Sequence, residues 1–207
     1  MTRPGVQRII RYAFRLAQSR PRKLLTVVTK SNAQRHAMVM WDEIAAEVAR
    51  EFPDVTWDKM LVDAMTMRMV MKPQSLDTIV ATNLHADILS DLASELSGSL
   101  GLAGSIMAGD TLCCAQAQHG SAPDIAGKGV ANPLAACLTL ALLLDHLHED
   151  AAAARLRAAV EHVVRAGEVT PDLGGRCTTT QSTDAVLRAL EGGHGLAPRD
   201  PEDGRAR

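Results

Sequence analysis

Residues 83–101 read NLHADILSDLASELSGSLG, and this stretch places two carboxylates, Asp87 and Asp91, four residues apart among apolar and small side chains. In a helix, residues i and i+4 lie on one face, so both carboxylates point in the same direction. Like charges beside a core destabilise it unless a cation or several donors compensate them. Two interpretations stay open, a site for a hard divalent metal ion and the solvated face of an ordinary helix. The side chains that we expect to draw this helix into a core are Ile88, Leu89, Leu92 and Leu96.

Helix and strand patterns alternate through the rest of the first half. Short β-branched runs such as KLLTVVT are typical of buried strands, and longer amphipathic stretches separate them. This alternation predicts an α/β fold with a largely parallel or mixed sheet. The predicted helices lie at 4–19, 38–51, 65–71 and from 83, and the predicted strands at 24–29, 55–61 and 77–82.

The second half is predicted to form a separate domain. Glycines at 98, 101, 104 and 109 break the periodicity, and we place a domain crossover there. The residues from 191 to 207 combine Gly, Pro and charge without an apolar period, which predicts a disordered tail. We therefore expect domains at 1–98 and 99–190. The second of these domains should contain one strand at 111–115 and helices at 133–147, 151–166 and 183–190.

Composition excludes several classes of function. The chain has 207 residues, 46% hydrophobic and 22% charged, so it can bury a core. Aromatic residues are only 2% and the formal net charge is -2, which argues against a nucleic-acid partner. The longest apolar run is too short to span a bilayer. The four cysteines show no metal-ligand spacing and are too few for a disulfide framework, which favours a cytoplasmic protein, and we expect the adjacent Cys113 and Cys114 to be buried.

The first 41 residues contain nine Lys or Arg and no Asp or Glu. Such a segment is superficially similar to an organelle transit peptide. The alternative is an amphipathic first helix with Val6, Ile10, Ala13 and Ala17 on its inner face and the arginines outside. We favour the helix, because the apparent buried strand KLLTVVT follows it directly.

Polar side chains follow each predicted strand of the first half. Lys30 follows the first strand, Asp63 the second, and Asp87 with Asp91 occupies the first turns of the helix after the third. In open α/β sheets ligands bind at the carboxyl ends of the strands. If the three aspartates converge, their oxygens suit Mg²⁺ or Mn²⁺ rather than zinc.

A Gly-rich loop, HGSAPDIAGKGVANP at 119–133, is a second candidate site. Glycines allow close approach of the backbone to a ligand, and an Asp in a nucleotide site can accept both ribose hydroxyls. The loop lacks the GxGxxG fingerprint, so a Rossmann assignment fails. The ordinary interpretation, a simple turn, stays open from this pattern alone.

Three segments together resemble one family: VDAMTMRMV, NLHADILSDLASELSGSLGL and HGSAPDIAGKGVANP are similar to signatures of the metal-dependent β-decarboxylating dehydrogenases. This isocitrate/isopropylmalate dehydrogenase family also includes homoisocitrate, tartrate and D-malate dehydrogenases. The resemblance runs from about residue 3 to residue 190 and includes TPDLGG at 170–175. It implies an isopropylmalate-dehydrogenase-like sheet with flanking helices. Residues 1–98 would be the second half of the substrate and dimerisation domain, and 99–190 the C-terminal part of the NAD-binding domain.

The resemblance also implies residue roles. Asp87 and Asp91 would bind Mg²⁺ or Mn²⁺, with Asp63 contributed across a dimer. Lys30 would take the proton from the substrate hydroxyl, with Asn32 nearby on the substrate. A lysine acts as a base near neutral pH only where burial or a nearby cation lowers its pKa, and the metal would supply that cation. The residues implied to contact the cofactor are Asn83, Gln116, His119, Gly120, Ala122, Asp124 and Asn132.

Asp124 is the residue that implies the choice of dinucleotide. A carboxylate there accepts the ribose diol but repels a 2′-phosphate, so NAD is favoured over NADP. Gln116 and Ala117 depart from the family pattern, because many members have Glu-Pro at these positions. A glutamine can still donate and accept hydrogen bonds there, which indicates a subgroup of the family rather than inactivity.

Two functional expectations follow from where the resemblance starts. Met1 matches a point near the middle of the family fold, so the N-terminal half, with its substrate-clamping arginines and a tyrosine proton donor, would be missing. The first expectation is a truncated NAD-dependent enzyme that decarboxylates a 2-hydroxy dicarboxylic acid, 3-isopropylmalate-like or else isocitrate, tartrate or D-malate. It would be a poor catalyst alone, and would act as a homodimer or with a separate N-terminal half. The alternative is a catalytically inactive fragment acting as a metal-binding or oligomerisation module.

Overall fold

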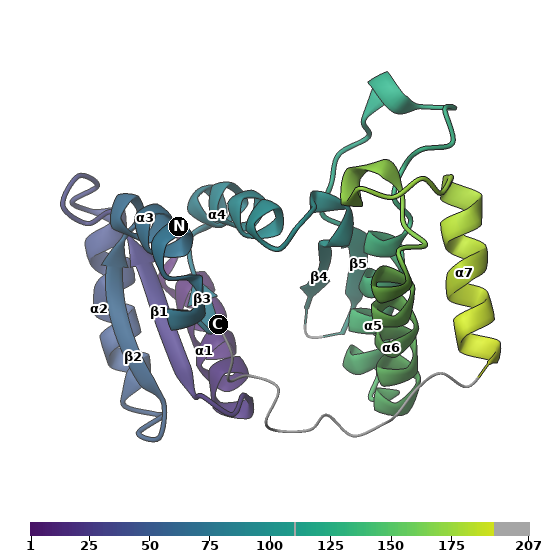
Figure 1. Cartoon of the computed structure of the whole chain (residues 1–207). Helices are drawn as coiled ribbons and strands as arrows, with labels where there is room; N and C mark the ends of the chain where they lie inside the picture. Colours follow the sequence, from purple (N-terminus) through teal and green to yellow (C-terminus); the bar gives the residue numbers. More distant parts are fainter. Residues whose placement is uncertain (110, 193–207) are drawn as a thin grey trace. The chain divides into compact units, whose positions relative to one another are not determined.

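The computed structural model describes residues 1–109 and 111–192, and the chain divides into two compact units (Figure 1). Unit 1 is Met1–Leu96 and unit 2 is Ser97–Arg207. The division follows residue 96, whereas the sequence placed it after residue 98. The predicted disordered tail begins at 191, where the final helix ends, and from 193 onwards it lies outside the described residues.

Unit 1 contains a three-stranded parallel sheet, which confirms the α/β prediction. The strand order is β2 (Thr56–Leu61), β1 (Leu24–Thr29), β3 (Thr78–Val80). Leu25 of β1 pairs with Trp57 of β2 on one side and with Thr78 of β3 on the other. All three strands run the same way, so their carboxyl ends lie at one edge of the sheet.

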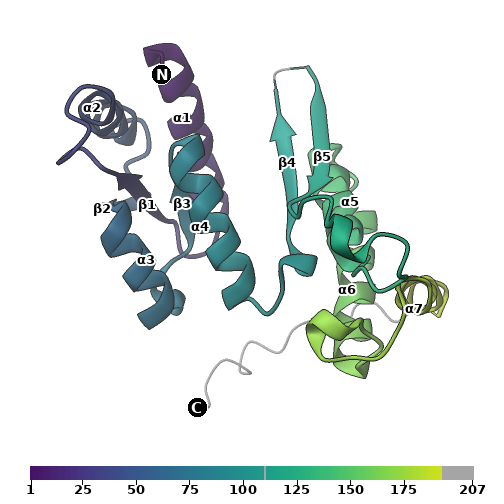
Figure 2. The same ribbon diagram turned by 90° about the horizontal axis from the view of Figure 1, so that it is seen from above.

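Helices cover both faces of this sheet (Figure 2). Successive side chains of a strand point to opposite faces, and β1 is buried on both. Leu25 and Val27 of β1 pack with α1 (Arg3–Ser19) and α2 (Ala37–Ala49), while Val28 packs with α3 (Val62–Met71) and α4 (Asn83–Leu96). The sheet is therefore the middle of three layers, as its apolar runs predicted.

The basic N-terminal segment is a structural helix, as predicted. Val6, Ile10 and Phe14 of α1 are buried against the sheet and α2. On its outer side, Arg3 pairs with Glu47 of α2 at 2.9 Å and Arg11 with Glu51 at 2.7 Å. Arg3 and Arg11 thus meet one carboxylate on α2 and one just beyond its end.

Two predicted core residues of α4 are exposed. Leu89 is 3% exposed and packs on Met65 and Met69 of α3, whereas Ile88 is 56% and Leu96 45% exposed. The expectation of burial was wrong for these two because α4 packs against unit 1 along a narrower stripe than its apolar residues occupy. Unit 1 by itself therefore leaves an apolar face of this helix uncovered.

Unit 2 stacks a two-stranded antiparallel sheet on three helices (Figure 1). Strands β4 (Gly104–Ala108) and β5 (Cys113–Ala117) contact α5 (Leu134–His146), and α6 (Asp150–Ala166) lies between α5 and α7 (Thr179–Glu191). The core of unit 2 includes Leu134, Val160, Val163 and Val186. Short 3₁₀ helices in the chain are η1 (Pro73–Ser75), η2 (Leu100–Leu102), η3 (Pro123–Ile125) and η4 (Pro171–Leu173).

Strand β4 was not predicted from the sequence. Glycines at 104 and 109 weaken the strand pattern, since glycine is depleted in strands. Gly104 is required by packing, because a Cβ there would lie 2.8 Å from the backbone nitrogen of Thr139 in α5. The expectation for the cysteines was also wrong, since Cys113 is half-buried and Cys114 exposed on alternate faces of β5. Within the described residues, no helix is both long and apolar enough to cross a membrane.

Candidate functional site

The carboxyl edge of the parallel sheet brings together two of the predicted residues. Lys30 is the first residue after β1, and Asp63 lies in the first turn of α3, which begins directly after β2. Lys30 Nζ donates a hydrogen bond to Asp63 Oδ1 at 2.5 Å. Both residues belong to the same chain. Their contact places a cation and a carboxylate where open α/β sheets bind ligands.

This ion pair fixes the charge state of Asp63. The hydrogen bond from Lys30 is the main reason why the pKa of the Asp63 carboxyl lies below its usual range. The carboxylate is 64% exposed, whereas the Lys30 side chain is only 27% exposed. Asp63 therefore presents an ionised, accessible oxygen, and Lys30 is held beside it.

Asp87 and Asp91 lie one turn apart on α4, and both are exposed. The predicted carboxylate pair on one helix face is thus present. In the part of the chain that the structure describes, no group of three or more His, Cys, Asp or Glu could hold a metal ion. The three aspartates are therefore not gathered by a single chain. Their donor type, accessible carboxylate oxygen, nevertheless fits a hard divalent cation.

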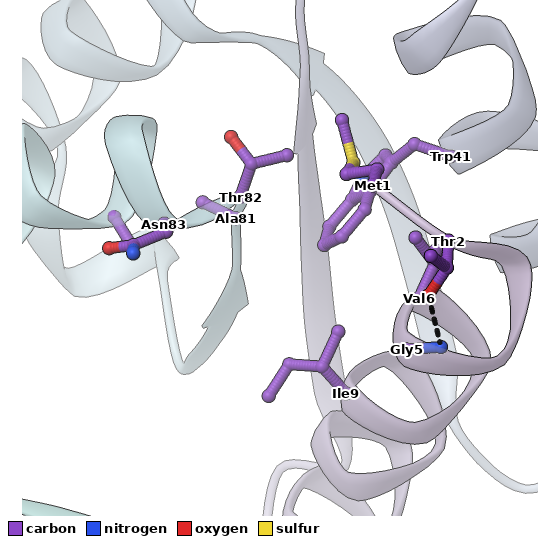
Figure 3. A pocket seen from close by; sticks show the side chains of 10 residues that line it. Met1, Thr2, Gly5, Val6, Ile9, Trp41, Ala81, Thr82 and Asn83 are labelled. Carbon is purple, nitrogen blue, oxygen red and sulfur yellow. Dashed lines mark hydrogen bonds between the residues drawn. The ribbon is translucent and has the colours of Figure 1, made fainter.

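The remaining unit 1 candidates lie in the segments that follow β1 and β3. Asn32 is exposed in the turn after Lys30, and Asn83 is the exposed first residue of α4. Asn83 lines a pocket of about 420 Å³ between the start of α1, Trp41 of α2 and residues 81–86 (Figure 3). Among the described residues, the indole Nε1 of the buried Trp41 finds no hydrogen-bond partner. Most of the pocket lining is apolar, so it differs in character from the Lys30–Asp63 edge.

In unit 2, the Gly-rich loop is exposed and turns sharply. Ala122 adopts a left-handed conformation with φ of 42°, directly before η3, and Asp124 lies exposed in η3. His119 Nδ1 lies 3.0 Å from the carbonyl oxygen of Gly120. Gln116, on β5 before the loop, is exposed and accepts a hydrogen bond from Ser105 Oγ through its backbone oxygen. In the described part of the chain, a Cβ at Gly120 would meet nothing within 4 Å, so the loop leaves open space at this residue.

Asn132 differs from the other loop candidates because both polar atoms of its side-chain amide form hydrogen bonds within the protein. Its Nδ2 donates to Asp172 Oδ2 at 2.8 Å, and its Oδ1 accepts from the backbone nitrogen of Leu134 at 2.9 Å. Asp172 was quoted from the sequence only within TPDLGG and received no role. A carboxylate between a proline and two glycines was the available signal, but nothing in the sequence shows which donors it meets.

Comparisons with known proteins give a consistent result. The family described as isocitrate/isopropylmalate dehydrogenase matches residues 1–186. The Probable tartrate dehydrogenase/decarboxylase TtuC' of Agrobacterium vitis is 66% identical over 92% of this chain and 54% of its own length. The D-malate dehydrogenase [decarboxylating] of Escherichia coli is 43% identical over 91% of this chain and 55% of its own.

A solved structure shows the same fold. The crystal structure of isocitrate dehydrogenase from Methylococcus capsulatus matches with a TM-score of 0.90 at 45% identity, over 92% of this chain and 57% of that one. The chain thus spans about half the length of the relatives that it matches.

Proposed function

The chain belongs to the isocitrate/isopropylmalate dehydrogenase family, and on that premise we propose that it takes part in NAD-dependent oxidative decarboxylation of a 2-hydroxy dicarboxylic acid. Within this class we place tartrate first, ahead of a 3-isopropylmalate-like acid, D-malate or isocitrate. The support is the 66% identity to a probable tartrate dehydrogenase/decarboxylase, against 43% to a D-malate dehydrogenase and 45% to an isocitrate dehydrogenase.

The observation that carries the proposal is the contact between Lys30 and Asp63 at the carboxyl edge of the sheet. The proposal makes Lys30 Nζ, in its deprotonated amine form, the acceptor of the substrate hydroxyl proton. Asp63 orients this nitrogen, because its carboxylate accepts the Lys30 hydrogen bond at 2.5 Å. Asn32, exposed just beyond Lys30, would donate a hydrogen bond to a substrate oxygen.

Asp63, Asp87 and Asp91 would hold Mg²⁺ or Mn²⁺. When bound, the cation would supply polarisation of the substrate hydroxyl and a substrate carboxylate, and the dinucleotide would supply a hydride acceptor. Since one chain does not gather the three aspartates, we propose that Asp63 faces Asp87 and Asp91 of a second copy. Lys30 would then reach the second copy together with Asp63, because the two side chains are paired.

A homodimer would also cover the apolar face left open on α3 and α4. Its members are Met67, Val70, Met71, Leu84, Ile88 and Leu96, each between 45% and 68% exposed. Contiguous apolar surface on a monomer marks an interaction site. A two-fold dimer is the simplest assembly that buries one such face against its copy.

The dinucleotide would bind at the Gly-rich loop of unit 2, with further contacts from Asn83 and Gln116. His119, Gly120 and Ala122 would approach the adenosine, and the exposed Asp124 would accept hydrogen bonds from the ribose diol. A 2′-phosphate would meet the Asp124 charge and be repelled. NAD should therefore bind at least about tenfold more tightly than NADP, since like-charge contacts cost more than 1.4 kcal/mol in such sites.

Metal binding tests the proposal without requiring turnover. Mn²⁺ at a hundredfold excess over its dissociation constant should stabilise the protein by about 2.7 kcal/mol, measured as a shift of thermal unfolding. Asp87→Ala should abolish this shift, whereas Glu43→Ala, which removes an exposed carboxylate from α2, should keep it. An equal shift in wild type and Asp87→Ala would reject the metal assignment.

Turnover tests the reaction itself. NAD reduction would be followed with Mn²⁺ and tartrate, D-malate, isocitrate or 3-isopropylmalate, with and without the complementary half of the Agrobacterium vitis relative. We expect low activity from the 207-residue chain alone and a large gain with the added half, with tartrate the best substrate. If no acid supports turnover in the supplemented mixture while the protein sediments as a dimer, the alternative of an inactive oligomerisation module is favoured.

A further inference from the structure

Asp172 lies outside the residues assigned to the candidate site, yet its carboxylate joins segments of unit 2 that are far apart in sequence. Oδ2 accepts hydrogen bonds from Ser99 Oγ at 2.6 Å and from Asn132 Nδ2 at 2.8 Å, and Oδ1 accepts one from Thr170 Oγ1 at 2.5 Å. Burial acts to raise the pKa of Asp172, but these three donors outweigh it and the pKa is lowered. Asp172 is therefore an ionised acceptor, exposed at the surface of unit 2 but held by three donors.

The contacts of Asp172 continue into the first turn of α5. Asn132 uses its Nδ2 on Asp172 and its Oδ1 on the backbone N–H of Leu134, one of the helix-start donors that lack a partner within the helix. Gly101 packs directly on this pair. A Cβ at Gly101 would lie 2.7 Å from Asn132 Nδ2 and 2.8 Å from Asp172 Oδ2, so a larger residue would have to displace them.

A second set of contacts fastens the same end of the loop. The backbone N–H of Thr179, at the start of α7, donates to the carbonyl oxygen of Gly129 at 2.8 Å. Its Oγ1 donates to the carbonyl oxygen of Ala131 at 2.6 Å. Residues 129–132 are therefore held by η4 and α7.

The remainder of the loop is held differently. Between residues 119 and 128 the hydrogen bonds are short-range, such as Ile125 N to Ala122 O at 3.1 Å and Lys128 N to Ile125 O at 3.1 Å. His119, Gly120 and Asp124 are exposed there. The position of this part consequently depends on its two anchored ends, residues 129–132 and Gln118, whose backbone N–H donates to the carbonyl oxygen of Ala103 at 3.0 Å.

We propose that Asp172 is a positioning residue of the candidate dinucleotide loop, and that it acts through Asn132 to fix the C-terminal one of the two ends that hold residues 119–128. The inference rests on the proposed function for its ligand, a dinucleotide, but the anchoring of the loop is a property of the protein alone. In this proposal the side chain of Asn132 links Asp172 to the backbone N–H of Leu134. Asp172 does not itself contact the cofactor.

The direct test is Asp172→Asn, which keeps the size of the side chain but removes its charge and one acceptor oxygen. Backbone hydrogen exchange of the whole chain would be followed at residues 119–132 and, as a reference, in α6. We expect loop exchange to become about tenfold faster with α6 unchanged, since hydrogen bonds to a charged group are the stronger ones. Asp184→Asn is the matched control, because Asp184 is an exposed carboxylate of α7 in the same unit. It should change neither region.

A rescue distinguishes positioning from general destabilisation. In the double variant Asp172→Asn with Asn132→Asp, the amide and the carboxylate exchange places, and the carboxylate at 132 can still accept from the Leu134 N–H. Loop protection should return to within about threefold of wild type. Equal loop exchange in Asp172→Asn and Asp184→Asn, or faster exchange throughout unit 2 without rescue, would overturn the positioning role.

Titration with NAD separates this inference from the proposed function. If wild type binds NAD, Asp172→Asn should weaken the affinity about tenfold and Asp184→Asn should not; unchanged affinity in Asp172→Asn would overturn the positioning role. If wild type binds no NAD, the proposed cofactor is wrong, while the exchange experiment still supports or overturns the anchoring of the loop by Asp172.

Discussion

In unit 1 the candidate side chains lie on or directly beside regular secondary structure, whereas in unit 2 most of them lie in an exposed loop. Lys30 follows β1, Asp63 lies in the first turn of α3, and the two carboxylates of α4 are one turn apart. The loop at 119–133 instead depends on Asp172 and Thr179, which reach it from the far end of the chain. One site takes its geometry from core packing and the other from a few polar contacts.

The two regions should therefore respond to different kinds of substitution. Moving a unit 1 candidate requires disturbing a packed helix or strand, and close-packed interiors resist such changes. A loop anchored by a few hydrogen bonds can move when one donor or acceptor is lost, even if the core is intact. The predictions below test this contrast, starting with the largest expected effect.

Phe14→Ala should produce the largest loss, because it removes a core ring from unit 1. Phe14 is 0% exposed and stacks on Phe52 at a centroid distance of 5.4 Å. We expect the free energy of unfolding to fall by about 3–5 kcal/mol. Both tryptophans of the chain, Trp41 and Trp57, lie in unit 1, so their fluorescence during urea unfolding reports on it. Tyr12→Ala, at a residue 50% exposed on the same helix, should cost far less, and equal losses would contradict the packing.

Gly175→Ala should produce a comparable but smaller loss in unit 2. A Cβ there would lie 1.9 Å from the carbonyl oxygen of Val169, a backbone atom that cannot rotate away. The expected cost is about 3 kcal/mol, measured by hydrogen exchange of α6. Gly120→Ala is the matched control, since its new methyl group meets nothing within 4 Å. If α6 exchanges as slowly in Gly175→Ala as in this control, then residues 175 and 169 do not approach each other so closely in solution.

The stability contributed by Asp172 should depend on acid pH. Because its pKa is lowered in the folded state, this contribution is complete above the unfolded value of about 3.8 and is lost as pH falls through the folded pKa. Wild type should exceed Asp172→Asn by about 1–2 kcal/mol at pH 7. The difference should shrink below pH 3.8, as urea unfolding at several pH values would reveal. A difference that stays constant down to pH 2 would mean that the carboxylate is not the source of the stability.

The smallest predicted effect is that of salt on two carboxyl pKa values, because Asp63 and Asp172 are kept ionised by different kinds of donor. Asp63 is exposed beside the cation of Lys30, whereas Asp172 is held by hydroxyl and amide donors. Raising NaCl from 0.05 to about 1 M shortens the Debye length to about 3 Å and should raise the pKa of Asp63. The pKa of Asp172 should change less, since its donors carry no net charge. Carbon-detected NMR titration of both carboxyl groups would decide, and an equal response would remove the distinction.

Local sequence pattern was sufficient for much of unit 1. The strand at 24–29 was predicted with its observed bounds, and Lys30 and Asp63 were expected at strand ends because apolar runs stop immediately before them. Their mutual hydrogen bond was not predictable, since the two residues are 33 positions apart. The exposure of Ile88 and Leu96 was also missed, because periodicity shows that a helix has an apolar face but not how much of it a neighbour covers.

The sequence by itself determined the α/β fold, the family and the identity of the candidate residues, because helix and strand periods and long motifs are properties of neighbouring residues. Only the folded structure revealed β4, whose Gly104 is required by the close approach of Thr139, and the hydrogen bonds of Asp172. The Asp172 contact with Ser99 spans 73 positions in the chain. Such a contact forms only when packing brings distant segments together, and no local pattern encodes which donors a carboxylate will meet.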